Sequence, residues 1–113
     1  MPKLITKESM NQEQGEQGWT KTTLADAAVI GEPAMAAYVW RFEPNARGPE
    51  TIHGATDQLL YVIRGTGSVL VADVRLEVKP ESMIWMEPGD RYYFEAGQDG
   101  LEILQGYAPG DEG

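Results

Sequence analysis

The chain alternates between short hydrophobic segments and turn-forming residues. From Gly18 onward Gly or Pro recurs about every ten residues, and the segments between these marks are rich in β-branched and aromatic side chains. The segments are residues 34–42, 58–64, 67–73, 82–86, 91–96 and 101–107. Short strands bounded by regular turn signals predict an all-β sandwich or barrel. No segment has a convincing helical stripe, although residues 23–29 are compatible with one helical turn.

Both faces of residues 58–64 are apolar. Alternation along a strand separates two sets of side chains, which are Gln58, Leu60 and Val62 on one face and Leu59, Tyr61 and Ile63 on the other. A strand that is apolar on both sides is typical of burial from two directions. We therefore expect one face inside a barrel and the other against a second subunit or the N-terminal segment. In residues 91–96, Tyr92 and Phe94 share a face, and Tyr92 is predicted to point inward.

Length and composition indicate a single domain. A chain of 113 residues buries roughly two-thirds of the surface that its unfolded form exposes, which is enough for one core. Hydrophobic residues make up 42% and charged residues 24%, typical of a globular chain rather than a disordered one. Residues 1–18 are polar and follow neither a helical nor a strand period. We therefore predict a flexible polar arm over residues 1–18 and a β-barrel domain over residues 19–113.

The charge pattern argues against nucleic acid and membrane surfaces as partners. The formal net charge is -9, and the nine Lys and Arg residues are scattered, whereas both partners attract clustered positive charge. No apolar run approaches the roughly 20 residues of a membrane span, and no secretory segment is visible, so a cytoplasmic location is expected. The absence of cysteine excludes disulfides and thiolate sites.

One stretch, Gly48 to Gly67, holds the only histidine of the chain, His53. Its spacing resembles the first motif of the cupins, small β-barrels in which this motif reads G-x5-H-x-H-x(3,4)-E-x6-G. The second histidine of the motif falls on His53, its acidic residue on Gln58 and its last glycine on Gly65.

The second cupin motif, G-x5-P-x-G-x2-H-x3-N, is similar to residues 81–96. Its internal glycine falls on Gly89 and its histidine on Tyr92. The resemblance covers about residues 34–108 and implies an all-β fold, a single cupin barrel of the double-stranded β-helix or jelly-roll type. Cupins include many unrelated activities, so the fold alone carries little functional information.

The resemblance implies a metal site whose ligands are mostly replaced in this chain. Cupins that hold Mn, Fe, Ni or Zn use three histidines and one glutamate, and the equivalent positions here are Thr51, His53, Gln58 and Tyr92. Only His53 is a good ligand for a divalent transition metal, since amide and hydroxyl oxygens bind such ions weakly. We therefore expect no tightly bound metal and no other cofactor. Retention of a metal by His53, Gln58 and Tyr92, as in oxygenases and lyases of the family, is one alternative.

Without a metal, these positions imply proton-transfer chemistry. A neutral imidazole, with an unperturbed pKa of about 6.5, can remove or return a proton near neutral pH, so His53 is the candidate base. Tyr92 could donate a hydrogen bond to a developing oxyanion or act as the acid, while Gln58 and Thr51 position the substrate. The predicted function is an isomerase, cyclase or lyase acting on an apolar carbonyl-bearing or phenolic small molecule. A non-catalytic small-molecule-binding module is the other alternative.

Several aromatic and aliphatic residues fit either the barrel core or the wall of a ligand pocket. Core is the simpler interpretation for each one singly, yet a small barrel with Tyr and Trp at its mouth also describes a pocket for a flat ligand. The candidate substrate-binding residues are Thr51, Tyr38, Trp40, Leu60, Val62, Trp85 and Phe94.

A second copy of the chain is the expected macromolecular partner. Small cupins often pair through one sheet, and residues 58–64 provide an apolar strand face for such pairing. We therefore expect a homodimer.

Overall fold

The computed structural model describes residues 4, 6, 10–26, 35–52, 54 and 56–108, and within them all regular structure is β strand. This confirms the all-β prediction. The eight strands are β1 (Asn11–Gln14), β2 (Trp19–Ala25), β3 (Ala36–Phe42), β4 (Thr51–Ile52), β5 (Gln58–Val71), β6 (Val74–Val78), β7 (Met83–Met86) and β8 (Arg91–Tyr107).

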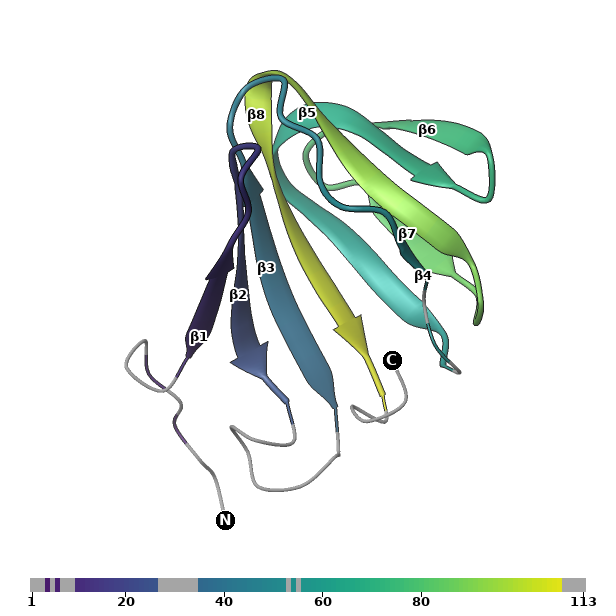
Figure 1. Cartoon of the computed structure of the whole chain (residues 1–113). Helices are drawn as coiled ribbons and strands as arrows, with labels where there is room; N and C mark the ends of the chain where they lie inside the picture. Colours follow the sequence, from purple (N-terminus) through teal and green to yellow (C-terminus); the bar gives the residue numbers. More distant parts are fainter. Residues whose placement is uncertain are drawn as a thin grey trace.

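The strands form one antiparallel sheet that folds over itself into two layers (Figure 1). The order along the sheet is β1-β2-β3-β8-β5-β6, with β4 attached to β8 and β7 attached to β5. The long strands β5 and β8 take part in both layers. The first half of β5 pairs with the second half of β8 and with β7, whereas its second half pairs with the first half of β8 and with β6.

Glycines allow β5 and β8 to bend where they pass from one layer to the other. The pairing register shifts between Val62 and Arg64 and again between Gly65 and Gly67. Gly65 has a φ of 88°, and a Cβ at this position would collide with the carbonyl oxygen of Gly100. Both the positive φ and the close approach of the two backbones therefore require glycine.

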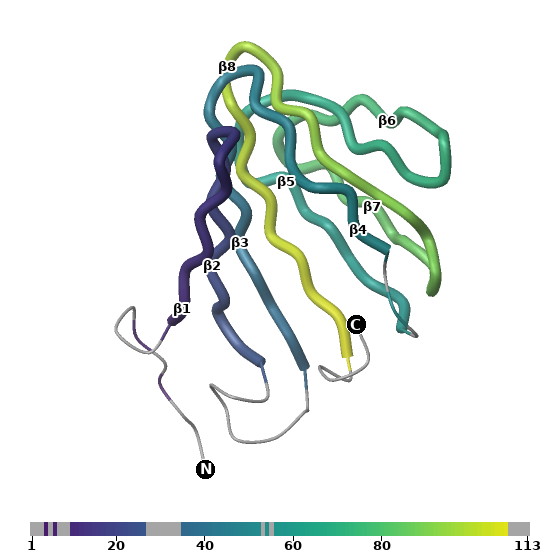
Figure 2. The backbone as a smooth tube through the Cα atoms, viewed as in Figure 1, coloured from purple at the N-terminus to yellow at the C-terminus, as the bar shows by residue number. Residues whose placement is uncertain are grey.

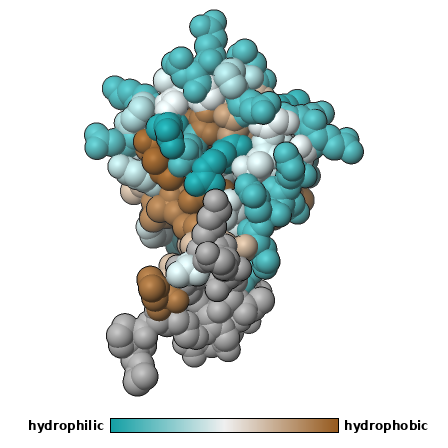
Figure 3. All heavy atoms as spheres, turned by 90° about the vertical axis from the view of Figure 1, so that its left-hand side faces the viewer, coloured by the Kyte–Doolittle hydropathy of each residue, from teal (hydrophilic) through white to brown (hydrophobic). Residues whose placement is uncertain are grey.

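The polar segment 1–18, expected to be an arm outside the barrel, contributes an edge strand. β1 runs antiparallel to β2, and the two lie side by side at the outer edge of the sheet (Figure 2). All four β1 side chains are exposed, so the strand has no buried face to produce an alternating pattern. When the molecule is viewed from the side on which β1 and β2 lie, apolar surface occupies the middle of the visible face, below hydrophilic side chains (Figure 3).

The helical turn with which residues 23–29 are compatible is not formed in the part that the structure describes. Residues 23–25 belong to β2 and pair with β3, because backbone pairing to a neighbouring strand overrides a weak local helix preference. Residues 27–29 lie outside the described residues.

Aromatic rings fill the barrel core. The Trp40 ring centroid lies 5.3 Å from that of Phe94 and 5.9 Å from that of Phe42, and Phe94 also contacts Tyr92 at 5.6 Å. Alternation along β8 buries Tyr92 and Phe94 together, as the sequence pattern predicts. The aliphatic members of the core include Leu60, Val62, Val69, Met86, Leu101 and Ile103.

Candidate active site

Polar side chains gather on the inner face of the barrel at the end away from the bend in β5 and β8. The register pairs them across neighbouring strands: Tyr38 with Gln105, Gln58 with Tyr107, and Thr51 with Tyr92. Paired residues project from the same face of a sheet, so this end of the interior has hydroxyls and amides where the other end has rings and aliphatic groups.

A chain of hydrogen bonds fixes the orientation of two buried amides. The indole Nε1 of Trp40 donates to Oε1 of Gln105 at 2.8 Å, and Nε2 of Gln105 donates to Oε1 of Gln58 at 2.5 Å and to the Tyr92 hydroxyl at 2.8 Å. An indole nitrogen can only donate, so it forces Gln105 to present its oxygen to Trp40 and its nitrogen to the other two partners. The orientation of Gln58 follows from that of Gln105.

This arrangement leaves one strong donor unused. Nε2 of Gln58 is buried and makes no hydrogen bond within the described residues. The residue itself is only 2% exposed. A buried polar group without a partner costs about 1–3 kcal/mol, so the barrel interior holds an amide donor that no described residue satisfies.

Tyr92 is held as a neutral phenol. Burial raises the pKa of its hydroxyl, and the hydrogen bond that the Gln105 amide donates to the phenol oxygen opposes that rise. The side chain is 4% exposed. Because Gln105 donates to the phenol oxygen, the proton of the hydroxyl stays available to a further acceptor.

A cavity of about 100 Å³ borders this polar cluster. It is lined by Lys21, Tyr38, Thr51, Ile52, Tyr92, Gln105 and Tyr107. The hydroxyls of Tyr38 and Tyr107 lie 3.1 Å apart. Burial, followed by the interaction with Tyr38, raises the pKa of Tyr107 far above its ordinary value, so Tyr107 is also a neutral phenol.

Lys21 supplies the positive charge of the cavity. It projects from the inner face of β2, and its Nζ lies 4.2 Å from the ring centroid of Tyr38 and 5.0 Å from that of Trp40. Removal from water lowers the pKa of the amine, and the charge of Glu13 opposes that shift. Ring faces attract a cation, so the two rings partly replace the lost hydration.

Most of the predicted substrate-binding residues lie in the packed interior. Trp40, Leu60, Val62 and Phe94 are each 2% exposed or less and belong to the hydrophobic core, and none of them lines the open cavity. Tyr38 and Thr51 line the cavity. Trp85 is 63% exposed and is not brought together with the others, because alternation along β7 buries its neighbour Met86 and turns Trp85 to the outer face.

The predicted base, His53, lies outside the described residues. The residues on both sides of it are described. Thr51 and Ile52 pair with the start of β8, and the carbonyl oxygen of Gly54 accepts a hydrogen bond from the Gly89 nitrogen at 3.0 Å.

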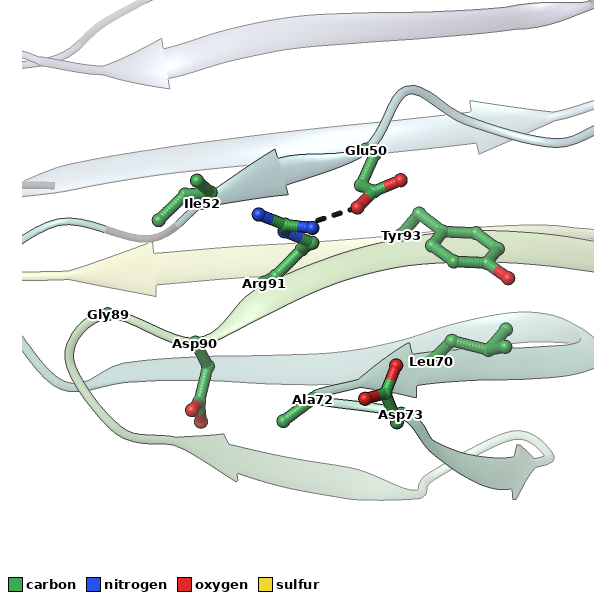
Figure 4. A pocket seen from close by; sticks show the side chains of 9 residues that line it. All are labelled: Glu50, Ile52, Leu70, Ala72, Asp73, Gly89, Asp90, Arg91 and Tyr93. Atoms are coloured by element: carbon green, nitrogen blue, oxygen red, sulfur yellow. Dashed lines mark ion pairs between the residues drawn. The ribbon is translucent and has the colours of Figure 1, made fainter.

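A further concave surface lies outside the barrel (Figure 4). This groove of about 380 Å³ is separated from the inner cavity by β8, where Arg91 and Tyr93 face outward and Tyr92 faces inward. Arg91 pairs with Glu50 across the groove at 3.2 Å. The pair is exposed, so its contribution to stability is small.

Three residues of the site are not predicted from the sequence: Gln105, Lys21 and Tyr107. Alternation through residues 101–107 puts Gln105 on the same face as Leu101 and Ile103, and a glutamine on an otherwise apolar face is the signal that could have found it. Lys21 carries no such signal, because its strand is only partly buried along its whole length.

The comparison with protein families now decides the classification. A family model described as a cupin domain matches residues 38–104. The chain belongs to the cupin family.

Several solved structures share the fold at low sequence identity. An RmlC-like cupin from Shewanella frigidimarina has a TM-score of 0.76 and 17% identity, and the match covers 96% of this chain and 92% of that one. KdgF from Halomonas sp. has a TM-score of 0.75 and 17% identity over 95% and 94% of the two chains. The polyketide cyclase RemF from Streptomyces resistomycificus has a TM-score of 0.73 and 19% identity over 95% and 79%. No curated protein sequence matches the chain significantly.

The described part of this cupin does not fit the metal that many cupins hold. Oε1 of Gln58 is already bonded to Gln105, and the atom left over is an amide nitrogen, which donates hydrogen bonds and does not ligate a cation. Thr51 and Tyr92 add only hydroxyls. No group of three or more His, Cys, Asp or Glu suitable for a metal occurs among the described residues. The residues present instead suit an oxygen atom of a ligand.

The described residues also contain no helix long and apolar enough to cross a bilayer.

Proposed function

We propose that this cupin is an enzyme that catalyses proton transfer on a small carbonyl-bearing or phenolic molecule, without a tightly bound metal. The observation that carries the proposal is the buried donor pair beside the cavity. The Tyr92 hydroxyl has its proton available, and Nε2 of Gln58 has no partner within the part of the chain that the structure describes. Two preorganised donors in a water-poor site stabilise a negative oxygen far better than water does, and such stabilisation is a large part of catalysis in many enzymes.

In the proposed reaction the substrate carbonyl oxygen accepts hydrogen bonds from Tyr92 and Gln58. His53 removes a proton from the carbon next to the carbonyl, the electron pair of the C–H bond becomes a C=C bond, and the carbonyl π electrons move to oxygen. The imidazolium then returns the proton to a different carbon for isomerisation or to a leaving oxygen for elimination. Thr51 and Gln58 hold the substrate in place during both steps.

The raised pKa of Tyr92 supports the donor role. A phenol that remains neutral well above pH 7 can donate a hydrogen bond throughout the pH range in which a histidine acts as a base. A cyclase, RemF, is among the structures with this fold, and here it supports only that the fold accommodates such chemistry.

Deuterium exchange tests the proposal without knowledge of the natural substrate. The protein is incubated in D₂O with pyruvate, cyclohexanone, acetophenone and 2-naphthol, and loss of the exchangeable C–H signal is followed by proton NMR. We expect enhanced exchange for at least one compound, and a reduction of about 10²-fold in both His53→Gln and Tyr92→Phe.

Tyr93→Phe is the matched control, because Tyr93 is adjacent in sequence but faces the outer groove. It should leave the exchange rate unchanged. Equal rates in Tyr92→Phe and Tyr93→Phe would contradict the proposal. Tight binding of one of the compounds without any exchange would favour a non-catalytic binding module. Stoichiometric metal in untagged protein, measured by elemental analysis, would favour the metal-dependent alternative.

We also propose that a second copy of the chain packs on the outer face of β5 and β7. Leu59 and Trp85 are directly paired there and both are exposed, next to exposed Ile63 and Met83. Adjoining exposed apolar side chains of this kind mark interaction sites, and symmetric dimers are the commonest soluble oligomers.

Light scattering on Trp85→Glu tests this interface. In a symmetric dimer this substitution buries one carboxylate from each subunit at the interface. The cost of burying these unpaired charges should convert the dimer to a monomer at micromolar concentration. The control is Val74→Glu, at an exposed apolar position on β6. A monomeric wild-type protein, or dissociation by both variants alike, would contradict the interface.

A further inference from the structure

The cavity wall carries the positive charge of Lys21, which forms no ion pair among the described residues. The four ion pairs among the described residues are formed by Arg41, Arg64, Arg75 and Arg91, and none includes Lys21. Lys21 nevertheless faces inward, next to Trp40 in the cross-strand register.

This absence is informative in a chain with an excess of acid. The sequence has 18 Asp and Glu against 9 Lys and Arg, so carboxylates for pairing are plentiful. An inward lysine loses part of its hydration, and its usual partner in a protein is a carboxylate. Here the exposed Glu13 lies opposite Lys21 in the β1–β2 register but makes no ion pair with it, and the other neighbours are the faces of two rings. The hydrogen-bonding capacity of the ammonium group is therefore unused.

The groups around Lys21 are also suited to binding a negatively charged oxygen atom. The hydroxyls of Thr51 and Tyr92 line the same cavity, and the Gln105 amide there has its nitrogen bonded to the Tyr92 oxygen. No carboxylate is found among the described residues that line this cavity. The Lys21 ammonium group and the Tyr92 hydroxyl can therefore donate hydrogen bonds to an anion without repulsion from a lining side chain.

The size of the cavity limits the ligand. Its volume of about 100 Å³ is smaller than the roughly 150 Å³ cavity that accepts a benzene ring. It therefore has room for a carboxylate and a few carbon atoms, and a larger ligand has to extend beyond it. One ammonium group matches a monoanion in charge.

We propose that Lys21 binds the carboxylate of a small organic acid in this cavity, which makes the substrate a carbonyl-bearing acid. The inference deepens the proposed function, because it rests on that function for turnover, whereas recognition of the acid depends only on Lys21 and the cavity.

Binding of matched pairs of acid and amide tests the inference. Acetate and acetamide, pyruvate and pyruvamide, and benzoate and benzamide are each titrated into the full-length protein, and dissociation constants are obtained from ligand-observed NMR. A charge-assisted hydrogen bond contributes about 1.5–3 kcal/mol, so at least one acid should bind about tenfold or more tightly than its amide.

Lys21→Met should remove this preference, and Lys21→Arg should retain part of it, since the charge is kept. Lys79→Met is the matched control, because Lys79 is exposed and lies outside the cavity, and it should retain the full preference. Thermal unfolding of each variant checks that it is folded before titration.

Three outcomes would overturn the inference: amides that bind as tightly as their acids, an acid preference that survives Lys21→Met, or inorganic phosphate that displaces every acid. Binding is measured without turnover, so the result is separate from the exchange test above. An acid preference that depends on Lys21, with no proton exchange, would support this inference and contradict the proposed function.

Discussion

The two ends of the barrel interior are built on the same strands and have opposite chemistry. Near the bend of β5 and β8, Phe42, Phe94 and Leu101 pack against one another and fill the space between the layers. At the other end, the same strands β3 and β8 present Tyr38 and Gln105 beside a cavity.

The difference separates what stabilises the fold from what is available for a ligand. The ring-filled end buries apolar surface, which favours folding directly. The polar end contains an amide nitrogen with no partner among the described residues and an amine with a lowered pKa, and each of these is unfavourable for the isolated chain. Groups that lower stability and are held in a defined orientation are typical of functional sites.

The largest loss of stability from a single substitution is expected at the ring-filled end of the interior. Phe94→Ala removes contacts with the rings of Trp40, Phe42 and Tyr92 and leaves a void that the surrounding strands cannot close. We expect a loss of about 3–5 kcal/mol in the free energy of unfolding, measured by urea denaturation. A loss below about 1 kcal/mol would show that this end is not the stabilising one.

The next largest loss of stability is expected at Gln105, where the polar end of the interior meets the aromatic rings. Gln105→Leu leaves Trp40 Nε1, Gln58 Oε1 and the Tyr92 hydroxyl without the partner that bonds all three. We expect a loss of about 2–3 kcal/mol in the same measurement, since each buried unpaired group costs about 1–3 kcal/mol and the cavity admits some water.

A double-mutant cycle sharpens that result. Gln58→Leu combined with Gln105→Leu removes both amides, and we expect the double variant to be more stable than the sum of the single losses predicts. Strictly additive losses would mean that the two amides do not interact.

A smaller effect on stability is expected for Tyr92→Phe. The change removes one hydroxyl and one hydrogen bond from Gln105 but keeps the ring contact with Phe94. We expect a loss of about 1 kcal/mol in urea denaturation, alongside the large loss of exchange activity. A loss as large as that of Phe94→Ala would place Tyr92 in the structural part of the interior.

The smallest effect is a pH dependence caused by Lys21. Its pKa is lowered in the folded protein, so between that lowered value and about 10.5 the unfolded chain binds more protons than the folded one. The contribution of Lys21 to the free energy of unfolding therefore rises with pH in this window. The titratable groups that face it are Glu13, Tyr38, Tyr92 and Tyr107.

The measurement is the difference in unfolding free energy between wild type and Lys21→Met from pH 7 to pH 10. The tyrosines are present in both proteins, so their effects largely cancel. We expect the difference to shift in favour of wild type as pH rises, and a flat difference would contradict the lowered pKa.

Much of the barrel was predictable from local pattern. Alternation in residues 58–64 and 91–96 correctly separates the buried Gln58, Leu60, Val62, Tyr92 and Phe94 from the residues on the outer faces. The cupin spacing predicted the family as well. The edge strand β1 was not predicted, because a strand exposed on both faces leaves no periodic signal.

The candidate site was predictable only in part. Residues within the two motifs, Thr51, Gln58 and Tyr92, were found because a spacing can be read along the chain. Gln105 and Lys21 lie outside both motifs, and they reach the cluster only through pairing of β2 with β3 and of β3 with β8. Trp85 was predicted as a substrate contact, and its outward direction follows from its register with Leu59 rather than from its residue type.

The amino-acid sequence by itself determined that strands form, where glycines permit a bend and which side chains share a face, because these depend on neighbours one or two positions away. Only the tertiary structure decided which faces meet. Trp40 orients Gln105 across 65 positions of sequence, and Gln105 in turn leaves the Gln58 nitrogen without a partner. Hydrogen bonds between distant strands depend on the strand register and on which way each side-chain amide is oriented, and neither property is encoded in a local pattern.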